Sequence, residues 1–393
     1  MKIMKKLFAL LIAIIPLVAT AQYNPDIVHT NISTTAQRTE IILPEVNGYT
    51  LYKADLHIHS FYSDGHCSPR YRVREAWLDG LDIIAITDHI EYRGNEQYFL
   101  EHLKGYTDGK VIKARNRVVI EKPATEEGIL VDLNLSVREA KKEAKKYDML
   151  IIPAAEITRE PVKIGHYNVL FSTDNNKIYD PDPMQALRNA RAQGALIMHN
   201  HPGWKRKSVE KTEFEVKAYN EGLIDGIEVV NGSQFYPKII DRAIEEKLFM
   251  ASTTDIHPTT AEFYRLKGDL RNMTFILAKD KSLKSIREAL EQNRTIGYSG
   301  GQIIGEEELL KAFFMAGVKA RLLDTDKKGR RSILVTNTTS LTFRLRRGKG
   351  ISHELSPFQS IYYTVDKGKN LTVTVDNMWI GDHKHPNITI PVE

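Results

Sequence analysis

The sequence predicts an α/β barrel followed by a small antiparallel β-sandwich. From residue 46 to 305, short apolar runs alternate with helical stretches, as in buried parallel strands joined by crossover helices. Most of these runs end in His, Asp or Glu, and barrels collect reactive side chains at the C-terminal ends of their strands. Beyond residue 319 the pattern changes to alternating apolar and Thr-rich polar positions separated by short turns, which is typical of antiparallel strands.

The first run of the barrel carries the first candidate metal ligands. Residues 49–58 have a β-strand pattern, so Asp55, His57 and His59 are expected to project to one face. The polar turn Ser63-Asp64-Gly65 brings another carboxylate back towards the two imidazoles. A lone His-x-His pattern also arises by chance on exposed strands, so the interpretation depends on partners farther along the chain.

Those partners follow in order, each at one end of an apolar run. They are Asp88 and His89 after residues 81–87, Glu156 after 149–155, His166 at the start of 166–171, His199 and His201 after 195–198, Asn231 after 227–230, and Asp255 and His257 after 249–254. Imidazole and carboxylate donors from several strand ends suit Mn, Fe or Zn. Such a site fits this sequence better than a zinc site built from thiolates. Asp55 and Asp88 either orient the ligating imidazoles or form salt bridges.

The other predicted elements follow from helix signals and from alternation. Helices are expected at 137–147, 180–194, 282–293 and 306–316, and the strands of the β-sandwich at 332–336, 341–346, 361–365 and 371–375. Between residues 91 and 131 the alternation breaks down directly after His89, and we expect a lid or specificity loop there. The His383-Lys-His385 pair lacks acidic partners and is expected to be exposed.

The N-terminus has the pattern of a secretory signal peptide. Lys2, Lys5 and Lys6 precede an apolar stretch at 7–18 and a small-residue site at 19–21, and the apolar stretch is too short to span a membrane. We therefore expect a signal peptide at 1–21, a leader at 22–45, the barrel at 46–305, and a C-terminal helix and β-sandwich domain at 306–393. The protein is then periplasmic or secreted.

Charge and cysteine content narrow the class of protein. The formal charge of +5 includes three lysines of the predicted signal peptide, so the mature chain carries 5 − 3 = +2. This near balance argues against a large nucleic-acid surface, and no later segment is apolar enough to span a membrane. The single cysteine, Cys67, excludes an intramolecular disulfide and is expected to be a structural thiol.

Taken in order, six motifs resemble those of the PHP (polymerase and histidinol phosphatase) superfamily of metal-dependent phosphoesterases. The motifs are Asp55-Leu-His-Ile-His-Ser with Ser63-Asp64-Gly65, Ile86-Thr-Asp-His89, Ala155-Glu156, Gly165-His166, His201-Pro-Gly203 and Asp255-Ile-His257. With the export signal, the chain looks most like the secreted, Sb-PDE-like phosphodiesterase branch. The resemblance implies a distorted (β/α)7 TIM-like barrel with two or three divalent metal ions (Mn, Fe or Zn).

The resemblance also implies a division of the ligands. His57, His59, Glu156 and Asp255 would hold one ion, and Glu156 would bridge to a second ion that also takes His166 and His201. Asp64, His89 and His257 would hold a third.

Three further residues are candidates for catalysis. His199 either assists His201 as a ligand or donates a proton to the leaving group, because both are expected on one strand face. Arg159 and Arg206 either contact phosphate oxygens or are ordinary surface bases.

The expected function is therefore extracytoplasmic hydrolysis of small organic phosphate esters, most simply of phosphodiesters, by attack of a metal-activated hydroxide. The expected partner is a small phosphate ester and not nucleic acid, and the sequence does not indicate an oligomeric state. The alternative is a metal-stabilised binding module at the cell surface whose β domain engages a glycan or a protein. Several clusters of acidic residues and histidines at one barrel mouth favour the enzyme, because a binding module does not need them.

Overall fold

The computed structural model describes residues 26, 37–93, 95 and 132–392. The described residues from 38 onward form one compact unit. The predicted signal peptide, most of the leader and most of the excursion after His89 lie outside the described residues. Within the described ranges, no helix combines the length and apolar character needed to cross a bilayer.

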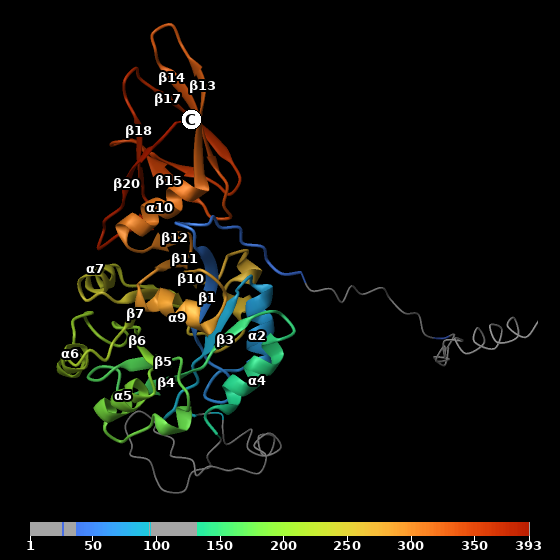
Figure 1. Ribbon diagram of the computed structural model, residues 1–393, viewed down its shortest axis with the longest axis vertical. Coiled ribbons are helices and arrows are strands. Elements are labelled where there is room, and N and C mark those ends of the chain that lie inside the picture. Colours follow the sequence, from blue (N-terminus) through green and yellow to red (C-terminus); the bar gives the residue numbers. More distant parts are fainter. Residues whose placement is uncertain (1–25, 27–36, 94, 96–131, 393) are drawn as a thin grey trace, which may run out of the picture. The chain divides into compact units, whose positions relative to one another are not determined.

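Two sheets hold the strands of the part of the chain predicted as a barrel, and the first also takes one strand from the predicted C-terminal domain (Figure 1). The first contains, in spatial order, β19 (Met378–Trp379), β12 (Gln302–Ile304), β11 (Thr295–Ser299), β10 (Met273–Ala278), β1 (Thr50–Ile58), β2 (Ile83–Ile86) and β3 (Leu150–Ile152). The second contains β4 (Ala154–Thr158), β5 (His166–Leu170), β6 (Leu196–Asn200), β7 (Gly226–Asn231) and β8 (Gln234–Phe235), with β9 (Phe249–Thr253) paired to β7.

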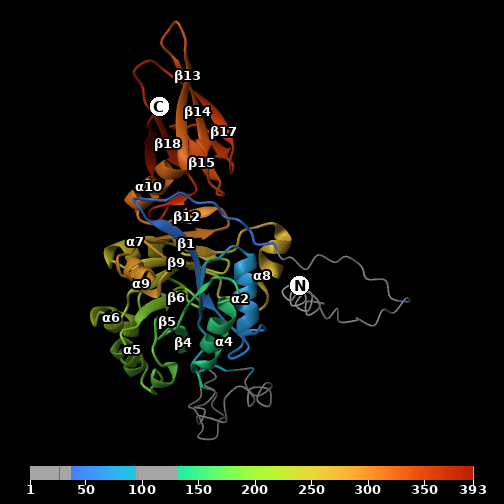
Figure 2. The ribbon, with the colours of Figure 1, turned by 45° about the vertical axis from the view of Figure 1, so that its right-hand side comes forward.

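The helices begin at residues that satisfy their free backbone N–H groups. Ser68, Asp182 and Ser282 accept such bonds at the starts of three helices, and Thr212 forms a capping box with Glu215. The α-helices are α2 (Pro69–Leu78), α4 (Leu135–Ala144), α5 (Pro183–Ala192), α6 (Glu213–Asn220), α7 (Pro237–Glu245), α8 (Thr260–Phe263), α9 (Leu283–Glu291) and α10 (Glu307–Gly317). Short 3-10 helices span Asn175–Lys177 and Arg265–Lys267. Helices α2 and α4 lie side by side in both ribbon views (Figures 1 and 2).

The expected closed (β/α)7 barrel is not confirmed by the strand pairing, which leaves two separate sheets among the described residues. Pro153 lies between β3 and β4, where the chain passes from one sheet to the other. Bridges between Ile58 and Ile256 and between His89 and Glu156 link the sheets at the rim where the strand ends meet.

The expectation of parallel pairing is correct only in part. Parallel pairs join β1–β2–β3 and β6–β7–β9, but β5 is antiparallel to both β4 and β6. The connection between β4 and β5 holds only residues 159–165, which is too short for a crossover helix. Because β5 runs the opposite way, its first residue, His166, lies at the rim where its neighbours end.

The C-terminal strands form two antiparallel sheets, as the alternating pattern predicts. One contains β13 (Val318–Thr325), β14 (Arg331–Asn337) and β17 (Ser360–Val365). The other contains β16 (Ser352–Leu355), β15 (Phe343–Arg346), β18 (Leu371–Val375) and β20 (Asn387–Ile390). Inward residues of both sheets belong to one hydrophobic cluster, and that cluster continues through α10 into β1, β10 and β11. The α/β sheets and the C-terminal sheets therefore share a core.

This shared core predicts coupled unfolding. Phe314 of α10 is fully buried and packs edge-on against Phe343, with ring centroids 5.1 Å apart. We expect Phe314→Ala to lower the free energy of unfolding by about 3–5 kcal/mol, measured by urea denaturation, with one transition for the whole unit. Phe358→Ala is the matched control, because that side chain is 54% exposed, and it should change stability by less than about 0.5 kcal/mol. Two transitions, of which only one moves, would show that the core is divided.

Candidate metal centre

The rim of the two sheets gathers all nine sequence-predicted metal ligands. Three groups of them have ligand atoms within 4.8 Å of one another: His57, His59 and Glu156; Glu156, His166 and His201; and His59, Asp64, His89 and His257. Asp255, the ninth, reaches the first group, with its Oδ1 2.9 Å from His59 Nε2 and 3.2 Å from His57 Nε2. The structure thus brings together the residues of each set that the resemblance implies, and it also places His59 beside the third set.

The first group forms where β1 ends against the segment after β9. The Nε2 atoms of His57 and His59 are 3.1 Å apart, and each is 3.6 Å from one oxygen of Glu156. Asp255 joins them because its backbone N–H donates to the carbonyl of His57 at 2.9 Å. The backbone of Asp255 has φ +49°, which a non-glycine residue seldom adopts and which ends the strand alternation.

The second group depends on a change of direction at the end of β6. The strand ends at Asn200, and His201 has φ +26°, so both side chains reach Glu156. Asn200 Nδ2 donates to Glu156 Oε1 at 2.8 Å, and His201 Nε2 lies 3.8 Å from the same oxygen. His166 Nδ1 approaches that oxygen to 3.2 Å from β5.

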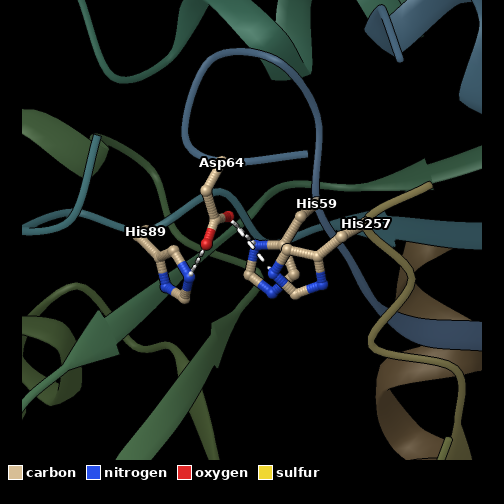
Figure 3. Close-up of side chains that lie close together, drawn as sticks. All are labelled: His59, Asp64, His89 and His257. Atoms are coloured by element: carbon tan, nitrogen blue, oxygen red, sulfur yellow. Dashed lines mark ion pairs between the residues drawn. The ribbon is translucent and has the colours of Figure 1, made fainter. Parts of the chain in front are cut away.

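The third group surrounds the carboxylate of Asp64 (Figure 3). Its oxygens lie 3.2 Å from His257 Nε2, 3.4 Å from His89 Nε2 and 3.8 Å from His59 Nδ1. The rings of His59 and His257 stack with centroids 4.4 Å apart. His89 also links this group to Glu156, because its Nδ1 is 2.5 Å from Glu156 Oε2.

Three of the imidazoles are held by one ring nitrogen and offer the other to the centre. His57 Nδ1 faces Glu228 Oε1 at 2.7 Å. In the other two imidazoles, one ring nitrogen donates to a backbone carbonyl. His166 Nε2 donates to the carbonyl of Arg159 at 3.0 Å, and His257 Nδ1 donates to that of Asp255 at 2.8 Å. A carbonyl can only accept, so in the neutral imidazole the opposite nitrogen carries the lone pair that a metal ion binds.

The charges of the centre are strongly coupled. Burial alone would raise the pKa of Glu156, but the imidazoles of His89, His57 and His166 outweigh it and hold that pKa well below its usual range. Burial lowers the pKa of His59 to about 4, helped by the neighbouring imidazoles of His89 and His257. The centre thus keeps buried carboxylates ionised beside an imidazole that resists protonation.

This arrangement fits divalent cations. Two imidazole nitrogens 3.1 Å apart, both facing carboxylates, satisfy each other poorly unless one is protonated or both bind a cation. Buried carboxylates also need a compensating positive charge. The donors are imidazole nitrogens and carboxylate oxygens, the set suited to Mn, Fe or Zn.

The side chains of the three residues predicted to take part in catalysis have partners outside the ligand groups. His199 points away from the rim, with Nδ1 3.0 Å from the Tyr219 hydroxyl and Nε2 3.1 Å from Glu215 Oε1. It does not share a face with His201, because the strand ends between them, so its expected role as ligand or proton donor is wrong. Arg206 pairs with the same Glu215 at 2.5 Å.

Arg159 is also engaged in the fold. Its guanidinium pairs with the buried Glu91 at 2.9 Å and donates to the carbonyl of Asp180 at 2.5 Å. The expected phosphate contacts of Arg159 and Arg206 are therefore not supported. Both bases have carboxylate partners instead, which a linear sequence does not show.

Glu228 is the functional residue that the sequence reasoning missed. It accepts bonds from His57 at 2.7 Å, from the backbone N–H of His201 at 2.6 Å and from Asn231 at 2.9 Å. Its signal in the sequence was a charged residue within the apolar run that forms β7. The structure buries this carboxylate completely, where it would be unstable without partners.

Asp55 and Asp88, each predicted either to orient an imidazole or to form a salt bridge, differ in their contacts. Asp55 forms a buried salt bridge with Arg271 at 2.5 Å and does not contact an imidazole ring among the described residues. Asp88 accepts from the backbone N–H of Ser60 at 2.7 Å and from the Ser63 hydroxyl at 2.8 Å, so it fixes the turn that carries Asp64.

A cavity of about 750 Å³ opens above the centre. Seven of the candidate ligands line it, together with segments that follow β7 and β9. Its remaining walls include Trp204, Asn231, Gln234, Phe263, Tyr264, Lys267, Leu270 and Asn272. The centre is therefore accessible to a small molecule.

The third group predicts a separable ion. We expect Asp64→Ala to remove one metal equivalent and to leave the others, because Asp64 is the only carboxylate within that group. Metal content of the purified protein by inductively coupled plasma mass spectrometry tests this. His199→Gln is the control and should keep the full content, and an Asp64→Ala protein with unchanged content would contradict the assignment.

The missed carboxylate gives a second prediction. Glu228→Gln should weaken metal binding about 10- to 100-fold, because the amide orients His57 without its negative charge. Isothermal titration of the metal-free protein with Zn²⁺ measures this. Asp225→Asn is the matched control, since Asp225 accepts from the backbone N–H of Ile197 at 2.7 Å at the opposite end of the strands. Equal effects of the two variants would contradict a role for Glu228 at the centre.

Comparison with known proteins identifies the family. Residues 55–304 match the PHP domain, and no curated protein shows significant similarity. A two-domain protein from Bacteroides vulgatus, containing a predicted PHP-like metal-dependent phosphoesterase, is 32% identical with a TM-score of 0.78, over 91% of this chain and 99% of that one.

Two more distant structures are similar at lower levels. A lesion-specific endonuclease from Pyrococcus furiosus is 16% identical with a TM-score of 0.38, over 65% of this chain and 59% of that one. An amidohydrolase from Chromobacterium violaceum is 14% identical with a TM-score of 0.33, over 52% and 87%. With the PHP match and the Bacteroides vulgatus structure as evidence, the chain belongs to the PHP domain family, and this membership is consistent with a metal-dependent hydrolase of phosphoric esters.

Proposed function

We propose that the protein is an extracytoplasmic phosphodiesterase that hydrolyses small organic phosphate esters with two or three divalent metal ions. The observation that carries this proposal is the convergence of nine imidazole and carboxylate ligands at one rim of a PHP domain. The narrower placement in a secreted, Sb-PDE-like branch is part of the proposal.

The residues have separate parts in this function. Divalent ions bound by the three groups would supply Lewis acidity and a water of lowered pKa. Glu156 contacts members of all three groups, so its carboxylate would keep adjacent cations close together. Glu228 and the backbone carbonyls of Arg159 and Asp255 fix the imidazole orientations before substrate enters.

The cavity supports a diester. Its lining includes Phe263, Tyr264 and Leu270 from the segment after β9 and Trp204 from the segment after β6, so apolar walls are available to the organic groups of an ester. Lys267 is the one Lys or Arg among the cavity-lining residues of the described chain. A singly charged diester places a smaller demand on positive charge than a doubly charged monoester.

Export is supported by the N-terminal pattern alone. The basic, apolar and small-residue stretches of residues 1–21 are typical of a cleaved signal peptide. A mature formal charge of 5 − 3 = +2 also favours a small substrate over nucleic acid.

The experiment uses the mature chain from residue 22 and three kinds of substrate. Bis(p-nitrophenyl) phosphate represents diesters, p-nitrophenyl phosphate represents monoesters, and a short DNA duplex represents nucleic acid. We expect hydrolysis of the diester, complete loss after chelation, and recovery with Mn²⁺, Fe²⁺ or Zn²⁺. Full activity of a metal-free preparation would overturn the proposal, and preference for the monoester or the duplex would overturn its substrate class.

A further inference from the structure

Arg72, on helix α2, is a buried guanidinium that touches the backbones of two ligand-bearing segments. Its Nε donates to the carbonyl of His59 at 2.7 Å, and its Nη1 donates to that of Pro258 at 2.7 Å. Its Nη2 donates to the carbonyls of Ile256 at 3.2 Å and of His257. The side chain has no exposed surface.

The charge of Arg72 is balanced within the same helix. Glu75, one turn later, pairs with the guanidinium and also accepts from the backbone N–H and the hydroxyl of Thr260, at 3.0 and 3.2 Å. Helix α2 therefore holds the segment after Asp255 through both members of the ion pair. A buried pair with its remaining donors and acceptors satisfied fixes geometry, although its net contribution to stability is small.

The held backbones carry the side chains of the third metal group. His59 and His257 stack at 4.4 Å, and both face Asp64, at 3.8 and 3.2 Å. The planar fork of a guanidinium can bond to carbonyls in several fixed directions, whereas a lysine ammonium is a compact point charge. The spacing of the two imidazoles thus depends on a side chain that contacts neither ring.

We infer that Arg72 is a positioning residue of the metal centre, which sets the separation of His59 and His257 and thereby the affinity of the ion held with Asp64 and His89. The inference rests on the metal centre of the proposed function. It does not depend on which ester is hydrolysed, because its test reads metal affinity and not turnover.

Two variants test the inference. Arg72→Lys keeps the charge opposite Glu75 but loses the fork, and Arg72→Met combined with Glu75→Leu removes both charges, so neither leaves an unpaired buried ion. Isothermal titration with Mn²⁺, together with metal content, should show at least about a tenfold loss of affinity for one ion, with the others retained. Adding Asp64→Ala to either variant should cause no further loss beyond Asp64→Ala alone.

Arg191→Lys is the matched control. Arg191 pairs with Asp225 at 2.7 Å and donates to the carbonyls of Ala195 and Leu223 at 3.3 and 2.9 Å, at the opposite end of β6 and β7. The Arg191→Lys variant should change the midpoint of thermal unfolding and leave all metal affinities unchanged. Unchanged affinities in both Arg72 variants would overturn the inference, and so would loss of the same ion in Arg191→Lys.

Discussion

The buried carboxylate of Glu156 is the interaction on which the rest of the centre depends. Its two oxygens lie within 4 Å of five imidazoles, which come from β1, β5, the end of β6 and the segment after β2. Glu156 belongs to two of the three ligand groups, and its contact with His89 reaches the third. A fully buried carboxylate needs positive charge around it, so its position requires that those strand ends meet.

The fold meets this requirement by departing from regular strand geometry. β5 runs antiparallel, which brings His166 to the common rim. His201 and Asp255 adopt positive φ values of 26° and 49°, and each turns a carboxylate or imidazole inward at the point where its strand stops. Non-glycine residues in this region cost on the order of 1–3 kcal/mol each, and such strain concentrates at functional sites. Glu228 and Arg72 then hold the turned segments through backbone bonds.

Much of the site could be predicted from the sequence, because metal ligands are recognised by residue type and by their place at the ends of apolar runs. All nine predicted ligands converge. The prediction for His199 was wrong because strand alternation was extended one residue too far, and a positive φ at His201 has no signal in residue type. The sequence does not show the carboxylate partners of Arg159 and Arg206, because Glu91 and Glu215 are distant in sequence or lie on another element.

Other features depend on long-range contacts that composition does not encode. The alternation beyond residue 319 correctly predicted antiparallel strands, and the helices predicted at 180–194, 282–293 and 306–316 are present to within a few residues at their ends. Strand direction was less predictable, because an apolar run reads the same whether its neighbour is parallel or antiparallel. The joining of β12 to β19 could not be foreseen either, since a two-residue strand has no periodicity.

The central claim is that Glu156 holds adjacent cations together, and anomalous X-ray scattering from crystals grown with Mn²⁺ tests it most directly. The account predicts at least two anomalous peaks at ligand distance from the Glu156 carboxylate, one beside His57 and Asp255 and one beside His166 and His201. An ordered centre with no peak at Glu156, or with a single ion bound by imidazoles alone, would contradict it.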